Sequence, residues 1–260
     1  SQAITFNSTE FKASATQNGE AVTLVSLTSS GAAATAGVNG SPYAIVASGA
    51  TGGAGFLASN YAITYVNGSL TVNPAALSIL ANNVTKTYGQ TATTNGYTPT
   101  GLVNGDTLSS VTLTPSGGTA ANANVGTYSI AASNAVGSSA NGSGTNATNF
   151  SANYAISYLN GSLVVNPAAL TITANSTSKT YGTAVTFNGT EFTASPTQNG
   201  ETVTLVSLSS AGALGTAGVN GSPYAIVASG ATGGAGFLAA NYAINYVNGS
   251  LAVNPAALTV

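Results

Sequence analysis

The same block of residues occurs three times along the chain. Residues 60–75 read Asn-Tyr-Ala-Ile-Thr-Tyr-Val-Asn-Gly-Ser-Leu-Thr-Val-Asn-Pro-Ala, and near-copies occupy residues 153–168 and 241–256. The copies start 93 residues apart (153 − 60) and then 88 residues apart (241 − 153). A period near 90 residues indicates one small domain repeated in tandem. It also points away from catalysis, because an active site is rarely needed three times along one chain.

A second similarity links residues 1–77 to residues 182–258, which match almost letter for letter, whereas the middle copy is a looser relative. The first and third copies are therefore of one type and the middle copy is of another, an A-B-A pattern. We call the three copies repeat A, repeat B and repeat C in chain order. We expect repeat A at residues 1–76, lacking its first strand, repeat B at 77–169 and repeat C at 170–257. Residues 258–260 would open a further repeat, so we interpret the chain as part of a longer array.

Short segments with alternating apolar and polar residues predict strands in every repeat. β-Branched residues and Tyr, which favour strands, dominate them. The predicted strands include residues 22–27, 43–46, 77–79, 111–113, 128–130, 170–172, 203–208 and 224–227. One short helical turn is expected at residues 102–107 and its equivalents.

The repeated block itself predicts a β-hairpin. Asn67-Gly68 is typical of a two-residue type I′ turn. Such a turn would place Tyr65 opposite Leu70 and Ile63 opposite Val72, with these side chains on one face. We expect that face to form the core of each repeat.

These patterns predict an all-β chain of tandem small β-sandwich (Ig-like) domains. Asn73-Pro74 joins one repeat to the next without a flexible linker, and Pro restricts its own φ and the residue before it. The domains are therefore expected to form a semi-rigid rod. β-Grasp-like domains with one short helix are the alternative.

An ordered series of motifs resembles a known family. Lys86-Thr87-Tyr88-Gly89 is followed by Gly-Leu-Val-Asn-Gly-Asp at 101–106, by Val-Gly-Thr-Tyr-Ser-Ile at 125–130 and by the repeated block. This order resembles the MBG and YDG-type repeats of large bacterial secreted adhesins, including filamentous-haemagglutinin-like proteins. Repeat C keeps Lys179-Thr180-Tyr181-Gly182 but has Thr-Gln-Asn-Gly-Glu at 197–201. The resemblance implies an extracellular or cell-surface stalk and no catalytic residues.

Charge is scarce, with three Lys, five acidic residues and neither Arg nor His. Nucleic acids and anionic lipid surfaces need clustered basic residues, so both are excluded as partners. No apolar run approaches the ~18 residues of a spanning helix, so membrane insertion is not expected. Without Cys or His, thiol and Ser-His-Asp chemistry are excluded. We expect no enzyme, catalytic residue, cofactor or metal site; the chain has no Asp-x-Asp pair to suggest calcium.

The few acidic residues occupy repeated positions. Glu20, Asp106 and Glu201 each follow an Asn-Gly pair at the same place in their repeats. We predict a structural role for them, in the ion pairs Asp106–Lys86 and Glu201–Lys179. An exposed pair of this kind contributes only ~0–1 kcal/mol.

Asn-x-Ser/Thr sequons are frequent, partly because the repeated Asn-Gly-Ser is itself a sequon. The candidate glycosylation sites outside that turn are Asn83, Asn141, Asn146, Asn149 and Asn175. Three of them, Asn141, Asn146 and Asn149, lie within a Gly-, Ser- and Asn-rich segment, residues 136–149. This segment is an insertion of repeat B and is expected to be an exposed loop.

Three functional hypotheses follow. The first is a structural repeat module of a long extracellular bacterial surface protein, as an adhesin stalk whose partners are neighbouring repeats, with host or surface glycans bound elsewhere in the protein. The second is a self-assembling extracellular filament, in which copies of the chain exchange strands. The third is a glycan-binding module that uses the 136–149 loop or Tyr residues.

Overall fold

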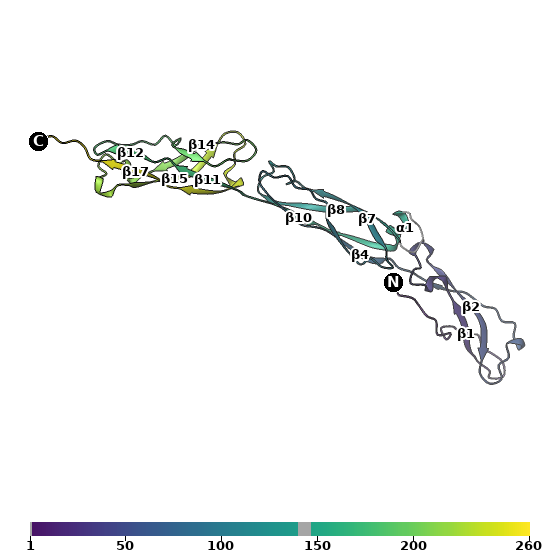
Figure 1. Ribbon diagram of the computed structural model, residues 1–260. Helices are drawn as coiled ribbons and strands as arrows, with labels where there is room; N and C mark the ends of the chain where they lie inside the picture. Colours follow the sequence, from purple (N-terminus) through teal and green to yellow (C-terminus); the bar gives the residue numbers. More distant parts are fainter. Residues whose placement is uncertain (1, 140–146) are drawn as a thin grey trace. The chain divides into compact units, whose positions relative to one another are not determined.

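The computed structural model describes residues 2–139 and 147–260, and it is built mainly from β-strands, as the sequence predicts (Figure 1). The chain divides into two compact units. Unit 1 comprises Ser1–Asn82, Gly96–Thr114 and Ala131–Asn160. Unit 2 comprises Asn83–Asn95, Pro115–Ile130 and Gly161–Val260. Repeat B contributes to both units, so each unit contains one junction between successive repeats.

Unit 1 contains repeat A and part of repeat B. One of its sheets has the strand order β1-β2-β3 and a second has the order β6-β4-β9. Its strands are β1 (Val22–Thr28), β2 (Tyr43–Gly52), β3 (Gly68–Leu70), β4 (Ala75–Ala81), β6 (Tyr97–Thr100), β7 (Thr107–Pro115) and β9 (Tyr154–Leu159). Its helical elements are η1 (Ser30–Ala32), η2 (Val38–Gly40), η3 (Ala58–Asn60) and α1 (Ala147–Asn153).

Unit 2 contains the rest of repeat B and all of repeat C. The long strand β8 (Gly126–Ser138) begins here and ends in unit 1. The other strands are β5 (Val84–Thr87), β10 (Gly161–Asn166), β11 (Ala168–Ala174), β12 (Thr177–Thr180), β13 (Phe192–Ala194), β14 (Val203–Ser209), β15 (Tyr224–Gly233), β16 (Tyr242–Val247) and β17 (Gly249–Asn254). Three 3₁₀ turns complete it: η4 (Ala211–Ala213), η5 (Val219–Gly221) and η6 (Ala239–Asn241).

Repeat C shows the complete domain. One sheet has the order β13-β11-β16 and the other has the order β12-β17-β15-β14. In the first sheet β11 is central, parallel to β16 and antiparallel to β13. In the second, β12 is parallel to β17. The chain therefore changes sheet twice in the same way, from β11 to β12 and from β16 to β17.

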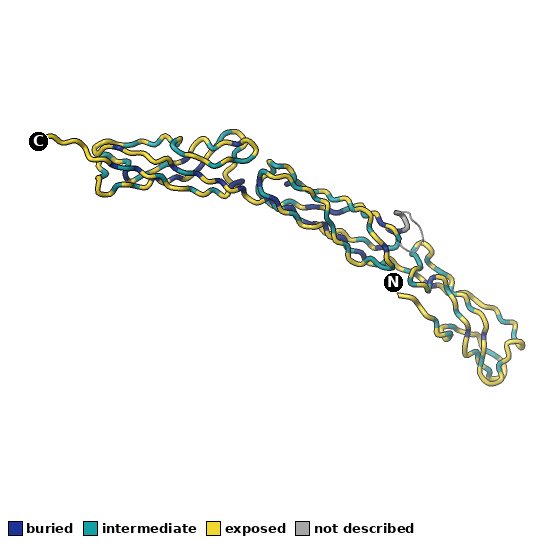
Figure 2. Tube along the Cα trace, in the orientation of Figure 1, coloured by how far each residue is buried: buried dark blue, intermediate teal, exposed yellow. Residues whose placement is uncertain are grey.

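The core lies between these two sheets, where buried residues alternate with exposed ones along each strand (Figure 2). Ile172 of β11, Ile226 of β15 and Leu251 of β17 are fully buried. In unit 1, Leu77 and Ile79 of β4 pack with Phe150 and Tyr154 in the same way. This period of two follows from strand geometry and confirms the predicted two-sided pattern.

The predicted hairpin is wrong. The strands on either side of Asn160-Gly161 and Asn248-Gly249 lie in different sheets, and β3 pairs with β2 instead. A type I′ turn needs positive φ at both central residues, and none of these Asn-Gly pairs has it. At position 249 the Gly is needed for space, because a Cβ there would lie 2.4 Å from the carbonyl oxygen of Ala174. In repeat C, Tyr242 and Leu251 are buried in the core as predicted. They reach the core from two different sheets and not from one hairpin.

Two smaller predictions are also corrected. Residues 102–107 form a turn leading into β7 and not a helix. The segment 136–149 is not simply an exposed loop: β8 continues to Ser138, and α1 begins at Ala147 and carries the buried Phe150. Residues 140–146 lie outside the described part of the chain.

The close approach at Gly249 gives a stability prediction. Gly249→Ala should destabilise repeat C by about 1–3 kcal/mol, because the backbone of Ala174 has to move to admit a methyl group. The matched control is Gly218→Ala, at a site with negative φ and no heavy atom within 4 Å of the added Cβ. Urea unfolding of both variants measures the difference, and equal midpoints would contradict the close packing of Gly249.

Candidate functional site: the contacts between repeats

The acidic residue of each repeat is positioned by the Asn-Gly turn before it. In repeat C, Asn199 and Gly200 both have left-handed φ, 54° and 74°. The turn closes with Glu201 N donating to Gln198 O at 2.9 Å, and Thr197 Oγ1 donates to the carbonyl oxygen of Glu201. Repeats A and B have the same Asn-Gly conformation before Glu20 and Asp106. Asn and Gly are used because they tolerate positive φ.

A tyrosine of the same repeat binds each acidic side chain. Tyr242, the first residue of β16, donates from its hydroxyl to Glu201 Oε2 at 2.8 Å. Its hydroxyl also accepts from Gln198 N at 2.9 Å, and its ring stacks on Phe237 with centroids 5.4 Å apart. The corresponding pairs are Tyr61–Glu20 at 2.7 Å in repeat A and Tyr154–Asp106 at 2.8 Å in repeat B.

Within unit 2, the carboxylate of Glu201 also binds a tyrosine of the preceding repeat. Tyr88 directly follows β5 of repeat B, and its hydroxyl donates to Glu201 Oε1. Tyr88 meets Tyr242 edge-on, with centroids 5.6 Å apart and planes at 77°. All three side chains are buried, with exposed fractions of 3% for Tyr88, 6% for Tyr242 and 8% for Glu201. We call this arrangement the shared-carboxylate contact.

Gly89, next to Tyr88, allows the two repeats to come this close. Its φ is +92°, and a Cβ there would lie 2.2 Å from Oε1 of Gln198 in repeat C. Both residues of the Tyr88-Gly89 pair therefore serve this junction. The tyrosine supplies the hydroxyl, and the glycine leaves room for the neighbouring repeat.

A buried asparagine adds further hydrogen bonds across the same junction. Asn241 is 1% exposed; its Oδ1 accepts from Val125 N at 2.9 Å, and its Nδ2 donates to Asn124 Oδ1 at 3.0 Å. Asn199 Nδ2 lies 3.4 Å from the carbonyl oxygen of Ala121. Because buried polar groups are costly when unpaired, these contacts fix the orientation of repeat C on repeat B.

Unit 1 contains the corresponding contacts between repeats A and B. Asn153 Oδ1 accepts from Val38 N at 2.8 Å, as Asn241 does from Val125. Asn104 Nδ2 donates to Ala34 O at 3.1 Å. The asparagine contacts thus occur at both junctions. Asp106 differs from Glu201 in that it accepts from Ser139 Oγ at 3.0 Å besides its own tyrosine.

The family comparison agrees with this repeated geometry. The model of the MBG domain (YGX type) matches residues 3–71, 77–164 and 170–252. The chain belongs to the MBG domain family. The Tyr-Gly-x motif of that name is present as Tyr88-Gly89-Gln90 and Tyr181-Gly182-Thr183. No curated protein matches the sequence significantly.

MBG domains are a structural family found as repeat modules of large surface proteins. In the described residues of this chain, no helix is long and apolar enough to span a membrane. The same part of the chain contains no cluster of three or more His, Cys, Asp or Glu side chains that could hold a metal ion.

The lysines of the MBG repeats have partners other than the predicted acids. Lys86, 5% exposed, donates to the carbonyl oxygens of Gln90, at 2.8 Å, and of Ala120. Lys179 donates in the same way to Thr183 O, at 3.0 Å, and to Leu214 O. Each ammonium group thus holds the turn that contains the Tyr-Gly-x motif, while Asp106 and Glu201 bind hydroxyl groups. Burial lowers the pKa of Lys86.

The candidate glycosylation sites are only partly described. Asn83 and Asn175 are exposed, although Asn83 Oδ1 accepts hydrogen bonds from both the amide and the hydroxyl of Ser162. Asn149 lies in α1, where its side chain is outside the description, and Asn141 and Asn146 lie outside the described residues altogether. Glycosylation of these residues stays a prediction.

Sequence reasoning missed the role of Tyr88 and of Asn241. Both occupy repeated positions in the motifs, Tyr-Gly after a Lys-Thr pair and Asn before the Tyr of the repeated block. Each recurs at the same place in the order of motifs, although the spacing of the Tyr from the acid is 18 residues in repeat B (106 − 88) and 20 in repeat C (201 − 181). That recurrence is the signal that could have identified them. Only the three-dimensional structure shows that they reach the adjacent MBG repeat.

Burial also controls the ionisation of the tyrosines. Burial, with the hydrogen bond to Glu201, raises the pKa of Tyr242 to about 12, and the same causes raise the pKa of Tyr88. Burial and the hydrogen bond to Asp106 also raise the pKa of Tyr154. These shifts favour the neutral phenol, which is the form that donates a hydrogen bond to a carboxylate.

The raised pKa predicts loss of stability in alkali. The contribution of Tyr242 should be fully present below pH 10, the ordinary tyrosine pKa, and should be lost as the pH rises from 10 to about 12. Circular dichroism combined with the near-ultraviolet absorbance of tyrosinate measures this transition. Tyr242→Phe should flatten it, whereas Tyr181→Phe, at a tyrosine 48% exposed, should leave it unchanged. A transition that is the same in both variants would contradict the assignment.

Proposed function

We propose that the chain is a non-catalytic structural segment of a long extracellular bacterial surface protein, in which MBG repeats form the stalk of an adhesin. The observation that carries the proposal is the shared-carboxylate contact, in which Glu201 of repeat C binds Tyr88 of repeat B. Two buried polar side chains of repeat C, those of Glu201 and Asn241, bind residues of repeat B. A stalk needs such joints, because it must transmit orientation from one repeat to the next.

The connections between repeats support the same function. Only Pro167 separates β10 of repeat B from β11 of repeat C. Proline fixes its own φ and biases the residue before it towards an extended conformation. With no flexible segment at this point, a reorientation of repeat C must break the buried contacts at Tyr88 and Asn241.

The strand pairing suits a protein that is pulled at both ends. In repeat C the first strand, β11, is parallel to β16, and β12 is parallel to the last strand, β17. Pulling on the two ends of the repeat draws parallel neighbours in opposite directions, so the hydrogen bonds between them are loaded together instead of one after another. That arrangement favours mechanical resistance, which a surface stalk requires.

Removing one hydroxyl group should loosen the junction between repeats B and C. Spin labels on Thr127→Cys in β8 and Thr204→Cys in β14 report on the two repeats, because both residues are exposed and the chain has no other cysteine. We expect pulsed electron paramagnetic resonance to give a narrow distance distribution that broadens in Tyr88→Phe.

The matched control is Tyr246→Phe, which removes a hydroxyl that accepts from Ala231 N inside repeat C. This variant should keep the narrow distribution. A broad distribution in the parent chain, or equal broadening in both variants, would rule out the fixed junction on which the stalk proposal rests.

A further inference from the structure

The acidic residue that follows the Asn-Gly turn differs in length between the repeats. It is glutamate in repeats A and C, at Glu20 and Glu201, and aspartate in repeat B, at Asp106. In each repeat one carboxylate oxygen accepts from the tyrosine of the same repeat, at 2.7–2.8 Å. The repeats differ in what binds the other oxygen.

In repeat C the other oxygen is bound by the preceding repeat. Glu201 Oε1 accepts from the Tyr88 hydroxyl of repeat B. The Cγ of Glu201, a methylene group that aspartate lacks, lies beside Gly236, where a Cβ would be 3.7 Å away. Glu20 Cγ lies in the same way beside Gly55, at 3.8 Å from the Cβ position. The longer acid therefore has the same local packing in repeats A and C.

In repeat B the other oxygen is bound inside the repeat. Asp106 Oδ2 accepts from the Tyr154 hydroxyl at 2.8 Å, and Asp106 Oδ1 accepts from Ser139 Oγ at 3.0 Å. Aspartate is shorter than glutamate by one carbon–carbon bond, about 1.5 Å. Because Ser139 belongs to repeat B, this second partner is present whichever repeat precedes repeat B.

Repeats A and C have no hydroxyl group at the position of Ser139. The three segments can be aligned on a glycine that packs against a phenylalanine in every repeat. These pairs are Gly52–Phe56, Gly137–Phe150 and Gly233–Phe237. Two residues after the glycine, repeat B has Ser139, whereas repeats A and C have Ala54 and Ala235. Glutamate thus occurs together with alanine, and aspartate together with serine.

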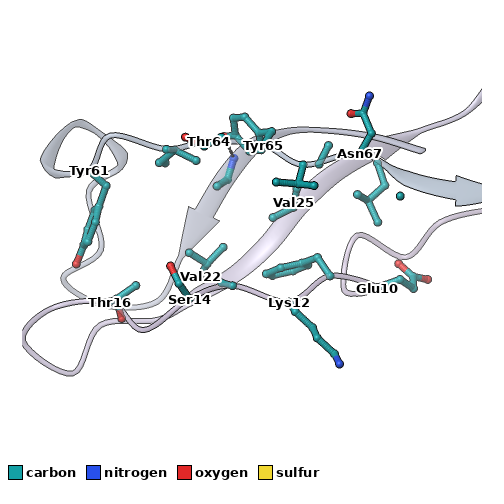
Figure 3. Close-up of a pocket in the computed structure, with 18 of the residues that line it drawn as sticks. Glu10, Lys12, Ser14, Thr16, Val22, Val25, Tyr61, Thr64, Tyr65 and Asn67 are labelled. Atoms are coloured by element: carbon teal, nitrogen blue, oxygen red, sulfur yellow. Dashed lines mark hydrogen bonds between the residues drawn. The ribbon is translucent and has the colours of Figure 1, made fainter. Parts of the chain in front are cut away.

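The turn around the acid in repeat A has the contacts seen in repeat C. The Tyr61 hydroxyl donates to Glu20 and accepts from Gln17 N at 3.0 Å. Thr16 Oγ1 donates to the carbonyl oxygen of Glu20, and Figure 3 shows the Tyr61 side chain pointing towards the segment that contains Thr16. Repeats A and C therefore hold the glutamate in the same way.

A neighbouring position follows the same division between the repeats. Gln198 of repeat C packs against Gly89 of repeat B, where a Cβ would lie 2.2 Å from Gln198 Oε1. Repeat A has Gln17 at this place, whereas repeat B has Val103. Repeats A and C thus share the side chains that meet the Tyr-Gly-x motif of repeat B, and repeat B itself lacks them.

We propose that this acid determines which repeat can follow repeat B: a repeat with glutamate forms the fixed junction, and a second copy of repeat B does not. An aspartate at position 201 would hold its oxygen about 1.5 Å further from the Tyr88 hydroxyl, beyond the range of a good hydrogen bond. Selectivity of this kind comes from contacts that the wrong partner cannot make. The inference rests on the stalk proposal and adds to it a rule for the order of repeats.

Shortening one side chain tests the role of the acid. With spin labels at Thr127→Cys and Thr204→Cys, Glu201→Asp should broaden the distance distribution as much as Tyr88→Phe does. The matched control is Glu191→Asp, which removes a methylene group from an acid that binds backbone amides of its own turn in repeat C. It should keep the narrow distribution. If Glu201→Asp stays narrow while Tyr88→Phe broadens, the rule of order is overturned and the stalk proposal stands.

Exchanging whole repeats tests the rule without altering a buried side chain. In a B–B chain, a second copy of residues 77–169 replaces residues 170–257, and the second label is Ser109→Cys of that copy, the counterpart of Thr204. In a B–A chain, residues 1–76 replace residues 182–257, and the second label is Thr23→Cys. We expect a broad distribution for the B–B chain and a narrow one for the B–A chain. A narrow distribution in the B–B chain, or a broad one in the B–A chain, would overturn the proposal.

Discussion

One buried carboxylate, that of Glu201, accepts hydrogen bonds from tyrosines of two different repeats. A carboxylate removed from water needs such partners, because an uncompensated buried charge is strongly destabilising. Tyr242 donates one hydrogen bond to this carboxylate from inside repeat C, and Tyr88 donates the other only when repeat B packs against repeat C. The requirement to satisfy this group therefore couples the internal packing of repeat C to its contact with repeat B. The positions of Gly89 and Asn241 follow from the same close approach.

The central strand is the second constraint on the fold. In repeat C, β11 joins β13 to β16 and brings Leu170 and Ile172 into the core. Repeat A has nearly the same flanking residues, yet residues 61–66 form no strand there. The local sequence is thus not sufficient for strand structure at this site, because the hydrogen bonds that define a strand come from its neighbours.

Much of the fold follows from the sequence alone. The period-two alternation at 203–208 and 224–227 predicted β14 and β15, and the order of the motifs around Tyr88-Gly89 indicated the MBG family. The pairing of strands did not follow. Asn248-Gly249 has the composition of a hairpin turn, but its Gly serves a close backbone contact with Ala174, and the chain crosses between sheets there. Composition cannot separate these two uses of glycine, because both require the absence of a Cβ.

The site was harder to predict than the fold. The repeated position of Glu201 indicated a structural role, but charge suggested lysine as its partner, and Lys179 instead binds the carbonyl oxygens of Thr183 and Leu214. Lys179 donates to two backbone carbonyls, while the acid binds phenols that burial keeps neutral. Such a choice depends on which groups share a buried space, which only the folded structure specifies.

The most direct test of the central claim is the coupling energy between Tyr88 and Glu201. A double-mutant cycle of Tyr88→Phe and Glu201→Gln measures it. The quantity compared is the free energy of the unfolding transition that includes repeat C. The shared carboxylate predicts a coupling of about 1–3 kcal/mol, because the two residues bind each other across the junction. The same cycle with Tyr246→Phe in place of Tyr88→Phe supplies the reference value near zero. A Tyr88–Glu201 coupling that is also near zero would contradict the account.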